Sequence, residues 1–487
     1  MENKLVYDIH DKPKFGALIV LAIQQVLAIL AATIAVPTII GLPTQIPAAI
    51  FGAGVGTIIY QLFTKFRSPV FLGSSFAFLS SLGVAVAYGY CGIILGSVVA
   101  GLVYVVIALI IHFVGTNWVD KLMPPVIIGP TVALIGLSLA GAAMSDIVKA
   151  NASSMYGSYN LVSLFCGFVA FLVIVICSTQ KKIKMARLIP FILGIIAGYA
   201  VAAVFTVIGK LADIDYLMII NFQPVVDNFV NADGSFRGIS AIFSVPSLAV
   251  FEAVKELMNG NVSPEILLAN ENAAVINAGG IAEVIIAFLP VALVVFAEHI
   301  ADHKNLSSII GKDLIKEPGL KRTLLGDGVG SIAGTVFGIC PNTTYGESVG
   351  CVAITRNASV ITITTTALMC IALSFISPLM AILQTIPSCV MGGVCLTLYG
   401  FIAVSGLKMF KNLDLDDNKN LFVVASILIS GIGGLVIQIP YAISETGEIT
   451  NTIQVTSIAT ALIIGIITNK ILSKVESGKL GKEPSAK

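Results

Sequence analysis

Charged residues are scarce in this sequence. Asp, Glu, Lys and Arg make up 11% of the 487 residues, whereas a soluble domain carries roughly 25%. Apolar stretches of about 18 residues or more recur along the chain, and the mean hydropathy is +0.97. These features exclude an ordinary soluble domain and indicate a polytopic membrane protein in a lipid bilayer. The basic residues gather in loops, which argues against a nucleic-acid surface.

Patterns that carry catalysis or bind metals are absent as well. The eight cysteines include no Cys-x-x-Cys pair, and most lie in apolar segments, which is typical of small core side chains. No nucleophile–base triad, phosphate loop or zinc spacing occurs. The glycines at positions 326, 328 and 330 lack the preceding strand of a dinucleotide fingerprint. The sequence therefore predicts no enzyme, no cofactor and no bound metal.

Hydropathy divides the chain into fourteen candidate spans. They cover about 15–36, 46–64, 70–88, 90–114, 122–144, 159–179, 187–208, 280–303, 318–338, 341–356, 358–376, 378–406, 419–440 and 451–470. The first span follows three lysines but is too long for the apolar core of a cleavable signal peptide. We therefore interpret it as a membrane helix.

Polar runs that contain glycine interrupt the third and tenth spans. They are Gly73-Ser74-Ser75-Phe76 in the first half and residues 342–348 in the second. Broken backbone at membrane depth is tolerated only where it is buried in protein or lines a cavity. Two interrupted segments in corresponding halves indicate the binding site of a transporter.

The basic residues support this segmentation. With the N-terminus inside, only four of the 28 Lys and Arg residues fall on outer loops: Lys149, Lys210, Arg237 and Lys255. This asymmetry follows the positive-inside rule and predicts that both termini are cytoplasmic. Seven spans precede the long loop 209–279 and seven follow it. An odd number in each half predicts an inverted repeat, with the loop outside and a short helix near 247–258.

Few ionisable residues lie within the spans, where they are costly and usually functional. Glu298 and Asp302 share one helix face of the eighth span, and two carboxylates in such a setting form a coupled pair that can exchange a proton. Glu347 follows Gly346 at the start of a half-helix, where exposed amides and a carboxylate can bind a neutral ligand with N–H donors. As alternatives, Asp302 and His303 simply end the helix, and Glu347 caps the next one.

Three further polar residues have two interpretations each. Asp327 lies within the ninth span, and its side chain either has a functional role or forms structural hydrogen bonds. Gln24 and Gln25 interrupt the first span, and they either face the site or form hydrogen bonds across helices.

The run 347–356 reads E-S-x-G-x-x-x-x-T-R and resembles the signature of the nucleobase–ascorbate transporter family. Residues 342–346, 297–299, 73–78 and 398–400 match the family in the same order. The likeness runs from the first span to about residue 470. Within the family, the sequence is most similar to the bacterial uracil:proton symporters.

The resemblance implies an all-α membrane fold. It has fourteen segments in two inverted repeats of seven, with a short strand in segments 3 and 10. The implied parts are a core (15–114 and 280–376), a gate (122–208 and 378–470), an extracytoplasmic loop (209–279) and a cytoplasmic tail (471–487).

The resemblance also implies roles for individual residues. Glu298 binds the base at the centre of proton coupling, and Glu347 accepts N–H bonds from a pyrimidine ring. The backbone amides of Phe76 and Gly346 donate to a carbonyl of the base. The remaining implied site residues are Tyr345, Ala32, Tyr399 and Ser75 in the pocket, and Asp302, Gln25 and Asp327 in proton coupling.

The expected function is proton-coupled import of uracil across the cytoplasmic (inner) membrane by alternating access, in a carrier that the family likeness suggests is a homodimer. A xanthine or urate symporter of the same family is the alternative. Its members tend to carry Gln where Glu347 stands, and Gln can also donate to a purine's acceptors. An anion carrier or channel of related architecture is a second alternative, which the buried acids disfavour. The sequence departs from common uracil carriers at Gln25, Asp302 and Ser348.

Overall fold

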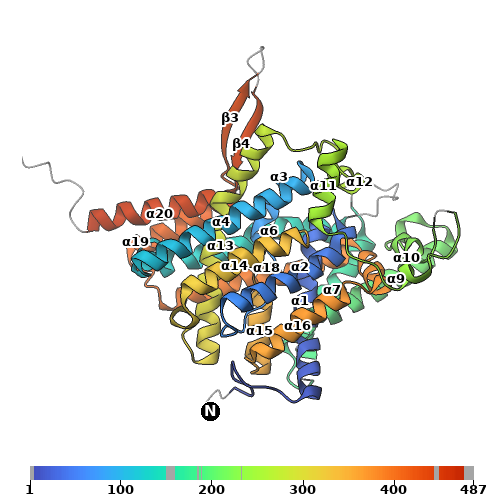
Figure 1. Ribbon diagram of the computed structural model, residues 1–487, viewed down its shortest axis with the longest axis horizontal. Helices are drawn as coiled ribbons and strands as arrows, with labels where there is room; N and C mark the ends of the chain where they lie inside the picture. The colour runs from blue at the N-terminus through green and yellow to red at the C-terminus, as the bar shows by residue number, and fades with distance from the viewer. Residues whose placement is uncertain are drawn as a thin grey trace, which may run out of the picture.

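The computed structural model describes residues 5–149, 159–183, 186–187, 189–231, 233–443 and 449–476. Most of them are helical (Figure 1). The helices are α1 (Phe15–Ile39), α2 (Ile46–Phe63), α3 (Leu79–Val86), α4 (Gly89–Val114), α5 (Asn117–Leu122), α6 (Pro125–Val148), α7 (Leu161–Thr179), α9 (Pro190–Ala212), α10 (Gln223–Phe229), α11 (Ala249–Asn259), α12 (Pro264–Ala269), α13 (Ala278–Ile310), α14 (Leu320–Val336), α15 (Gly346–Thr355), α16 (Val360–Leu373), α17 (Ser377–Gln384), α18 (Ser388–Lys408), α19 (Asn418–Ile432) and α20 (Ser457–Glu476). The strands are β1 (Leu72–Ser74), β2 (Asn342–Thr344), β3 (Ile437–Ile443) and β4 (Ile449–Val455).

Membrane-crossing helices dominate the described ranges. Nine of them are at least 18 residues long and apolar enough to span a bilayer, and three shorter apolar helices accompany them. A bilayer core of about 30 Å requires about 20 such residues per helix. The chain is therefore a multi-pass membrane protein.

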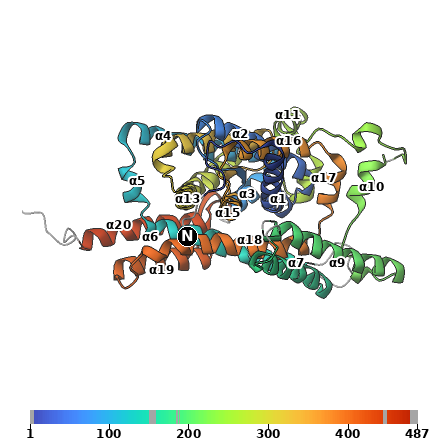
Figure 2. The same ribbon diagram turned by 90° about the horizontal axis from the view of Figure 1, so that it is seen from below.

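The helices pack in two layers. Figure 2 shows α6, α7, α9, α18, α19 and α20 in one layer and α1, α2, α3, α4, α13 and α16 in the other. In the first layer α6 packs against α18 and α19, and α7 packs against α9 and α18. In the second, α14 packs against α2 and α4, and α13 packs against α4. The short helices α5 and α17 connect the layers along the chain.

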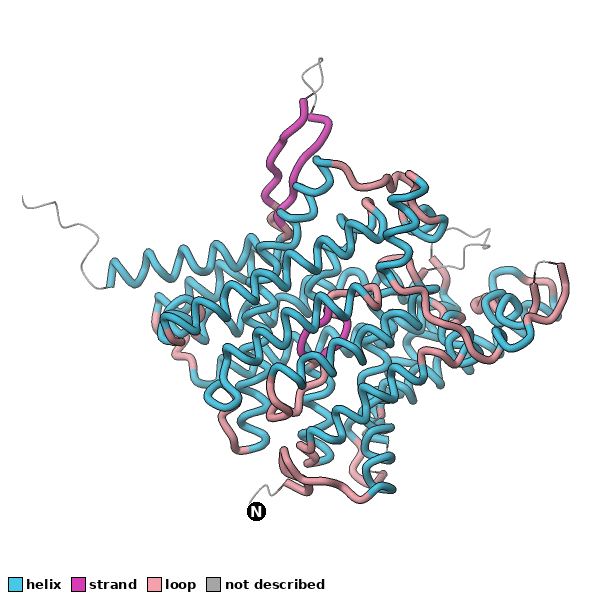
Figure 3. Tube along the Cα trace, in the orientation of Figure 1, coloured by secondary structure: helices cyan, strands magenta, loops and turns pink. Residues whose placement is uncertain are grey.

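Two short strands lie in the middle of the helical body. Figure 3 shows β1 and β2 there, far from the second strand pair at the edge. The two central strands are antiparallel, with Leu72 opposite Thr344 and Ser74 opposite Asn342. Each interrupts one of the two broken segments and is followed by a helix that starts at the centre of the protein.

Several helix boundaries differ from the sequence prediction, whereas one expected short helix is confirmed. The eighth span continues to Ile310 as α13, so Asp302 and His303 are buried inside a helix and do not end it. The twelfth is two helices, α17 and α18, because Pro387 follows the end of the first. The expected α11 near 247–258 is confirmed. Helix α20 reaches Glu476, and the rest of the predicted tail lies outside the described residues.

A β-hairpin replaces the junction of the last two predicted spans. Strands β3 and β4 pair where the spans 419–440 and 451–470 were expected. Gly433 and Gly434 end α19, and Gly434 has a positive φ of 71° that other residues rarely adopt. The residues that follow alternate and are rich in isoleucine, which favours a strand over a helix.

Candidate functional site

The irregular backbone around the two central strands lies inside the protein, and its polar groups are hydrogen-bonded there. Beyond the strand register, Ser75 N donates to Pro341 O and Tyr345 N donates to Phe71 O. The Thr57 hydroxyl both accepts from the Leu72 amide and donates to its carbonyl, at 2.9 and 3.1 Å. Since each unsatisfied group would cost several kcal/mol in a membrane, these contacts explain why the broken segments persist.

Tyr345 connects the second broken segment to the first through a hydrogen bond and a ring contact. Its hydroxyl donates to the Ser74 carbonyl over 2.9 Å, and its ring lies against Gly73 so closely that a Cβ on that glycine would collide with it. A glycine is therefore required at position 73 by close approach, and Tyr345 is itself buried.

A cavity of about 880 Å³ opens beside these strands. It is lined by both broken segments, by α13 and by the ends of α7, α9, α15 and α18. Phe76 and Gly346, which start the two central helical segments, both line it. The amides of a first helical turn have no partner within their own helix and carry partial positive charge, so the two helix starts offer donors to a ligand.

Three carboxylates face the same cavity. Glu298 and Asp302 reach it from α13, and Glu347 reaches it from the first turn of α15. Glu298 and Glu347 are half-buried, whereas Asp302 is buried and accepts a 2.7 Å hydrogen bond from Thr344 Oγ1. The arrangement combines hydrogen-bond acceptors with groups that can take up a proton.

Some buried polar atoms at the cavity have no hydrogen-bond partner in the described part of the chain. They are Ser74 Oγ, Ser75 Oγ and Glu298 Oε2. Buried polar atoms are nearly always paired in proteins, so each exception needs an explanation. A polar ligand bound between the strands and α13 would satisfy all three.

Four residues implied by the resemblance do not line the cavity. Ala32 is completely buried in α1, one turn beyond the cavity-lining Ala28. Tyr399 is buried in α18, and its ring packs edge-on against Phe76 at 5.3 Å. Gln25 donates a 2.5 Å hydrogen bond to the Ser348 hydroxyl. The fourth residue, Asp327, lies behind α13.

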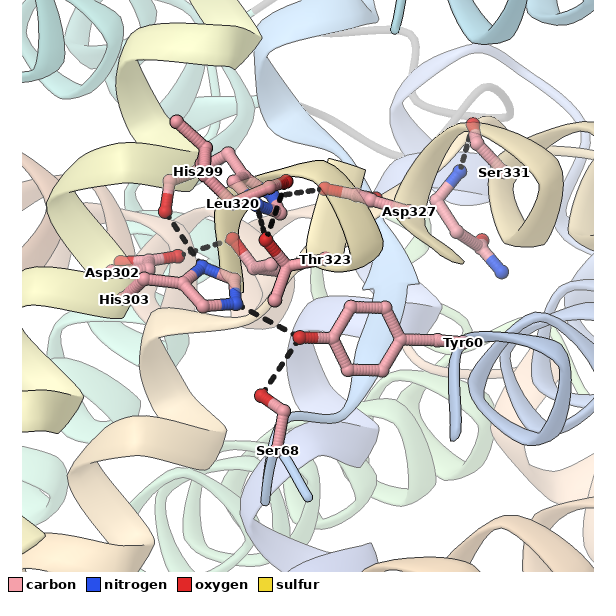
Figure 4. Close-up of polar contacts among 11 residues, drawn as sticks. Tyr60, Ser68, His299, Asp302, His303, Leu320, Thr323, Asp327 and Ser331 are labelled. Carbon is pink, nitrogen blue, oxygen red and sulfur yellow. Dashed lines mark hydrogen bonds and ion pairs between the residues drawn. The ribbon is translucent and has the colours of Figure 1, made fainter. Parts of the chain in front are cut away.

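Asp327 belongs to a buried polar network that Figure 4 displays. The His299 ring lies 2.6 Å from Asp327 Oδ2 through Nδ1 and 3.0 Å from Thr323 Oγ1 through Nε2. The next histidine on the same face, His303, lies 2.8 Å from the Tyr60 hydroxyl. The network connects α13 to α14 and α2.

Sequence reasoning missed several members of the site. Thr344, the partner of Asp302, stood inside the polar run 342–348 but had no assigned role. Arg187 and Lys408 also line the cavity, and Lys408 is exposed. Their position in basic loops was the available signal. Within the described ranges, no group of three or more His, Cys, Asp or Glu side chains could hold a metal ion.

Solved structures support the fold. The murine Solute Carrier 26 family member A9 anion transporter in the inward-facing state aligns with a TM-score of 0.62 at 10% identity, covering 96% of this chain and 69% of that one. The transmembrane domain of a cyanobacterium bicarbonate transporter BicA aligns with a TM-score of 0.51 at 14% identity, covering 95% and 100%. At these identities the likeness concerns the fold alone.

Sequence comparison identifies the family. The "Permease family" model matches residues 16–439. The uracil permeases of Bacillus caldolyticus and Bacillus subtilis (strain 168) are each 35% identical, covering 96% and 98% of this chain and 95% and 97% of theirs. That of Escherichia coli (strain K12) is 30% identical over 88% of both chains. The chain therefore belongs to this permease family, the nucleobase–ascorbate transporters that its motifs resemble, and is a membrane transporter rather than an enzyme.

Proposed function

We propose that this protein imports uracil together with a proton across the cytoplasmic membrane. The observation that carries the proposal is that Glu298 and Glu347 face one cavity from two different helices, beside two helix starts. The names of the relatives, all uracil permeases, agree with such a substrate.

The cavity offers complementary groups for each edge of uracil. Ionised Glu347 is an acceptor only and suits the ring N–H groups. The amides at Phe76 and Gly346 would donate to a ring carbonyl, and the Ser75 hydroxyl would supply one further hydrogen bond. The Tyr345 ring, held against Gly73, would form a wall beside the base, and Tyr399 and Ala32 would support this wall from behind.

Proton coupling would centre on α13. Glu298 would take up a proton while it contacts the base, and Asp302 on the same helix face would exchange that proton with the part of the cavity lined by Arg187 and Lys408. Gln25 would act through Ser348, the neighbour of Glu347, and Asp327 would act through His299, the neighbour of Glu298.

Transport would follow from motion between the two layers of helices. The layer with β1, β2 and α13 would be the core, and the layer with α6 and α18 would be the gate. In this proposal the chain has fourteen segments in two inverted repeats, both termini are cytoplasmic, and the 209–279 loop lies outside. The part of the cavity lined by Arg187 and Lys408 would then face the cytoplasm. A homodimer is proposed on family likeness.

Binding to the purified protein tests the substrate. We expect labelled uracil to bind, xanthine and urate to compete weakly, and Glu347→Gln to weaken uracil binding roughly 10- to 100-fold, since a hydrogen bond to a charged group contributes about 1.5–3 kcal/mol. Glu317→Gln is the matched control because its side chain is 72% exposed at the surface. Stronger binding of xanthine than uracil would favour the purine alternative, and ion currents without any nucleobase would favour the anion alternative.

A further inference from the structure

The segment before the first membrane helix is attached to the core like an additional strand. The Arg356 carbonyl accepts hydrogen bonds from the Val6 and Tyr7 amides, at 2.8 and 3.3 Å. Tyr7 O then accepts from Ala358 N over 2.8 Å, and Ile9 O accepts from Val360 N over 3.0 Å. Residues 5–11 therefore run parallel to the loop that connects α15 to α16.

An apolar side chain anchors this segment. Ile9 is only 5% exposed and belongs to a buried cluster with residues of four helices, α2, α13, α15 and α16. The cluster includes Val349 and Val352 of α15, Leu306 and Ile310 of α13, and Val360 of α16. By contrast, Val6 is 63% exposed on the same segment. The two side chains therefore lie on the same short segment and differ in burial.

A surface ion pair adds to the attachment. Lys312 Nζ donates to Asp8 Oδ2 over 2.6 Å, and this bond holds the pKa of the Asp8 carboxyl below its ordinary value. Both side chains are close to half exposed, and such pairs contribute little to stability. The Ser359 hydroxyl also donates to Asp11 O over 2.7 Å. The main attachment is therefore the burial of Ile9 together with the backbone bonds.

The backbone contacts of this segment begin directly after α15, the helix that carries Glu347. Helix α15 has ten residues, too few to be stable by itself in isolation. Its first turn holds Glu347 at the cavity, and its last residue is followed by Arg356 in a left-handed conformation with φ of 56°. Gly350 and Ile354 line the cavity, so that face of α15 borders open space. Residues 5–11 are bonded to the chain directly after the C-terminal end of the helix.

We propose that residues 5–11 form a positioning clip that holds α15 and thereby sets the place of Glu347 in the cavity. Ile9 is the positioning residue of the clip. It contacts no substrate and acts through α15. The inference rests on the proposed role of Glu347 in uracil binding, and it assigns a part in transport to a segment outside the membrane.

The first test compares Ile9→Ser with its matched control, Val6→Ser, in the full-length protein. We expect Ile9→Ser to weaken uracil binding about tenfold, since a small displacement of a binding group has effects of this size or larger, and Val6→Ser to bind like the wild type. In a Glu347→Gln background, Ile9→Ser should cause no further loss, because residues that act as one unit are not additive. Additive losses, or equal effects of the two serine variants, would overturn the proposal.

A second measurement does not depend on the substrate. Hydrogen–deuterium exchange of residues 346–356 should become faster in Ile9→Ser and stay unchanged in Val6→Ser, while α7 and α9 exchange as in the wild type. If the wild type binds no uracil, the proposed function fails. The exchange measurement would still test whether residues 5–11 hold α15 in place. Unchanged exchange of α15 in Ile9→Ser would contradict it. Should Ile9→Ser not fold, Ile9→Ala serves in both measurements.

Discussion

A buried hydroxyl group orients one of the three carboxylates of the cavity. The Thr344 hydroxyl lies on the central strand and reaches Asp302 on α13, so one hydrogen bond joins a broken segment to the helix that carries two of the acids. Its length of 2.7 Å is that of a strong bond to a carboxylate. The strand thus fixes the orientation of Asp302 as well as opening a space for the ligand.

Removal of this hydroxyl should slow proton-driven transport. Thr344→Val leaves the buried Asp302 without its donor, at a cost of about 1–3 kcal/mol, so we expect uptake to fall roughly 5- to 100-fold. Thr344→Ser keeps the hydroxyl and should retain most of the activity. Initial rates of uracil uptake in proteoliposomes provide the comparison. Equal rates in the valine and serine variants would exclude a role for the bond.

The sequence predicts the acids of the site but not their partners. Glu298, Asp302 and Glu347 stand out because charge is rare in membrane spans, and the structure brings all three to one cavity. The contacts of Thr344 with Asp302 and of Tyr345 with Gly73 join residues that are distant in sequence or hidden in a polar run. No local pattern encodes them, because they arise from the tertiary packing of β2 against α13 and of the two broken segments against each other.

The close packing of helices α2 and α14 supports the central strands. Helices α2 and α14 approach through glycines, and a Cβ on Gly52 would collide with the backbone of Gly334. The Gly52 carbonyl also accepts a 3.0 Å hydrogen bond from the Asn342 side chain of β2. Small residues at such crossings allow backbones in membranes to approach closely. The crossing therefore fixes β2 relative to α2.

Gly52→Ala should separate these two helices and destabilise the protein. Overpacking of this kind costs about 1–3 kcal/mol, so the melting temperature of the detergent-purified protein should fall and uracil binding should weaken with it. The control is Gly16→Ala in α1, where a Cβ meets nothing within 4 Å. A melting temperature for Gly52→Ala equal to that of the control would show that the backbones can move apart freely.

At the level of elements, long apolar runs were easy to predict and their interruptions were not. Helices α4 and α7 begin and end within about two residues of the expected spans, because hydropathy alone defines them. The β3–β4 hairpin was missed because its isoleucines were counted toward membrane helices, although paired glycines and alternating polarity were present. Hydropathy does not distinguish a strand from a helix in so short a run.

The whole molecule places its site where two layers of helices meet. The carboxylates and both central strands belong to one layer, while α7, α9 and α18 of the other layer close the cavity. A substrate held in this position would move relative to the gate when the layers shift against each other, as alternating access requires. The segmentation and charge pattern of the sequence predicted a transporter, but the layer packing is visible only in three dimensions.

Uptake of labelled uracil into proteoliposomes with an imposed inward proton gradient tests the central claim most directly, with the wild type measured beside Glu347→Gln. We predict that the gradient drives accumulation of uracil in the wild type and that Glu347→Gln abolishes most of it. Uptake whose rate does not depend on the proton gradient would contradict proton coupling. Transport of xanthine without uracil would keep the family but contradict the proposed substrate.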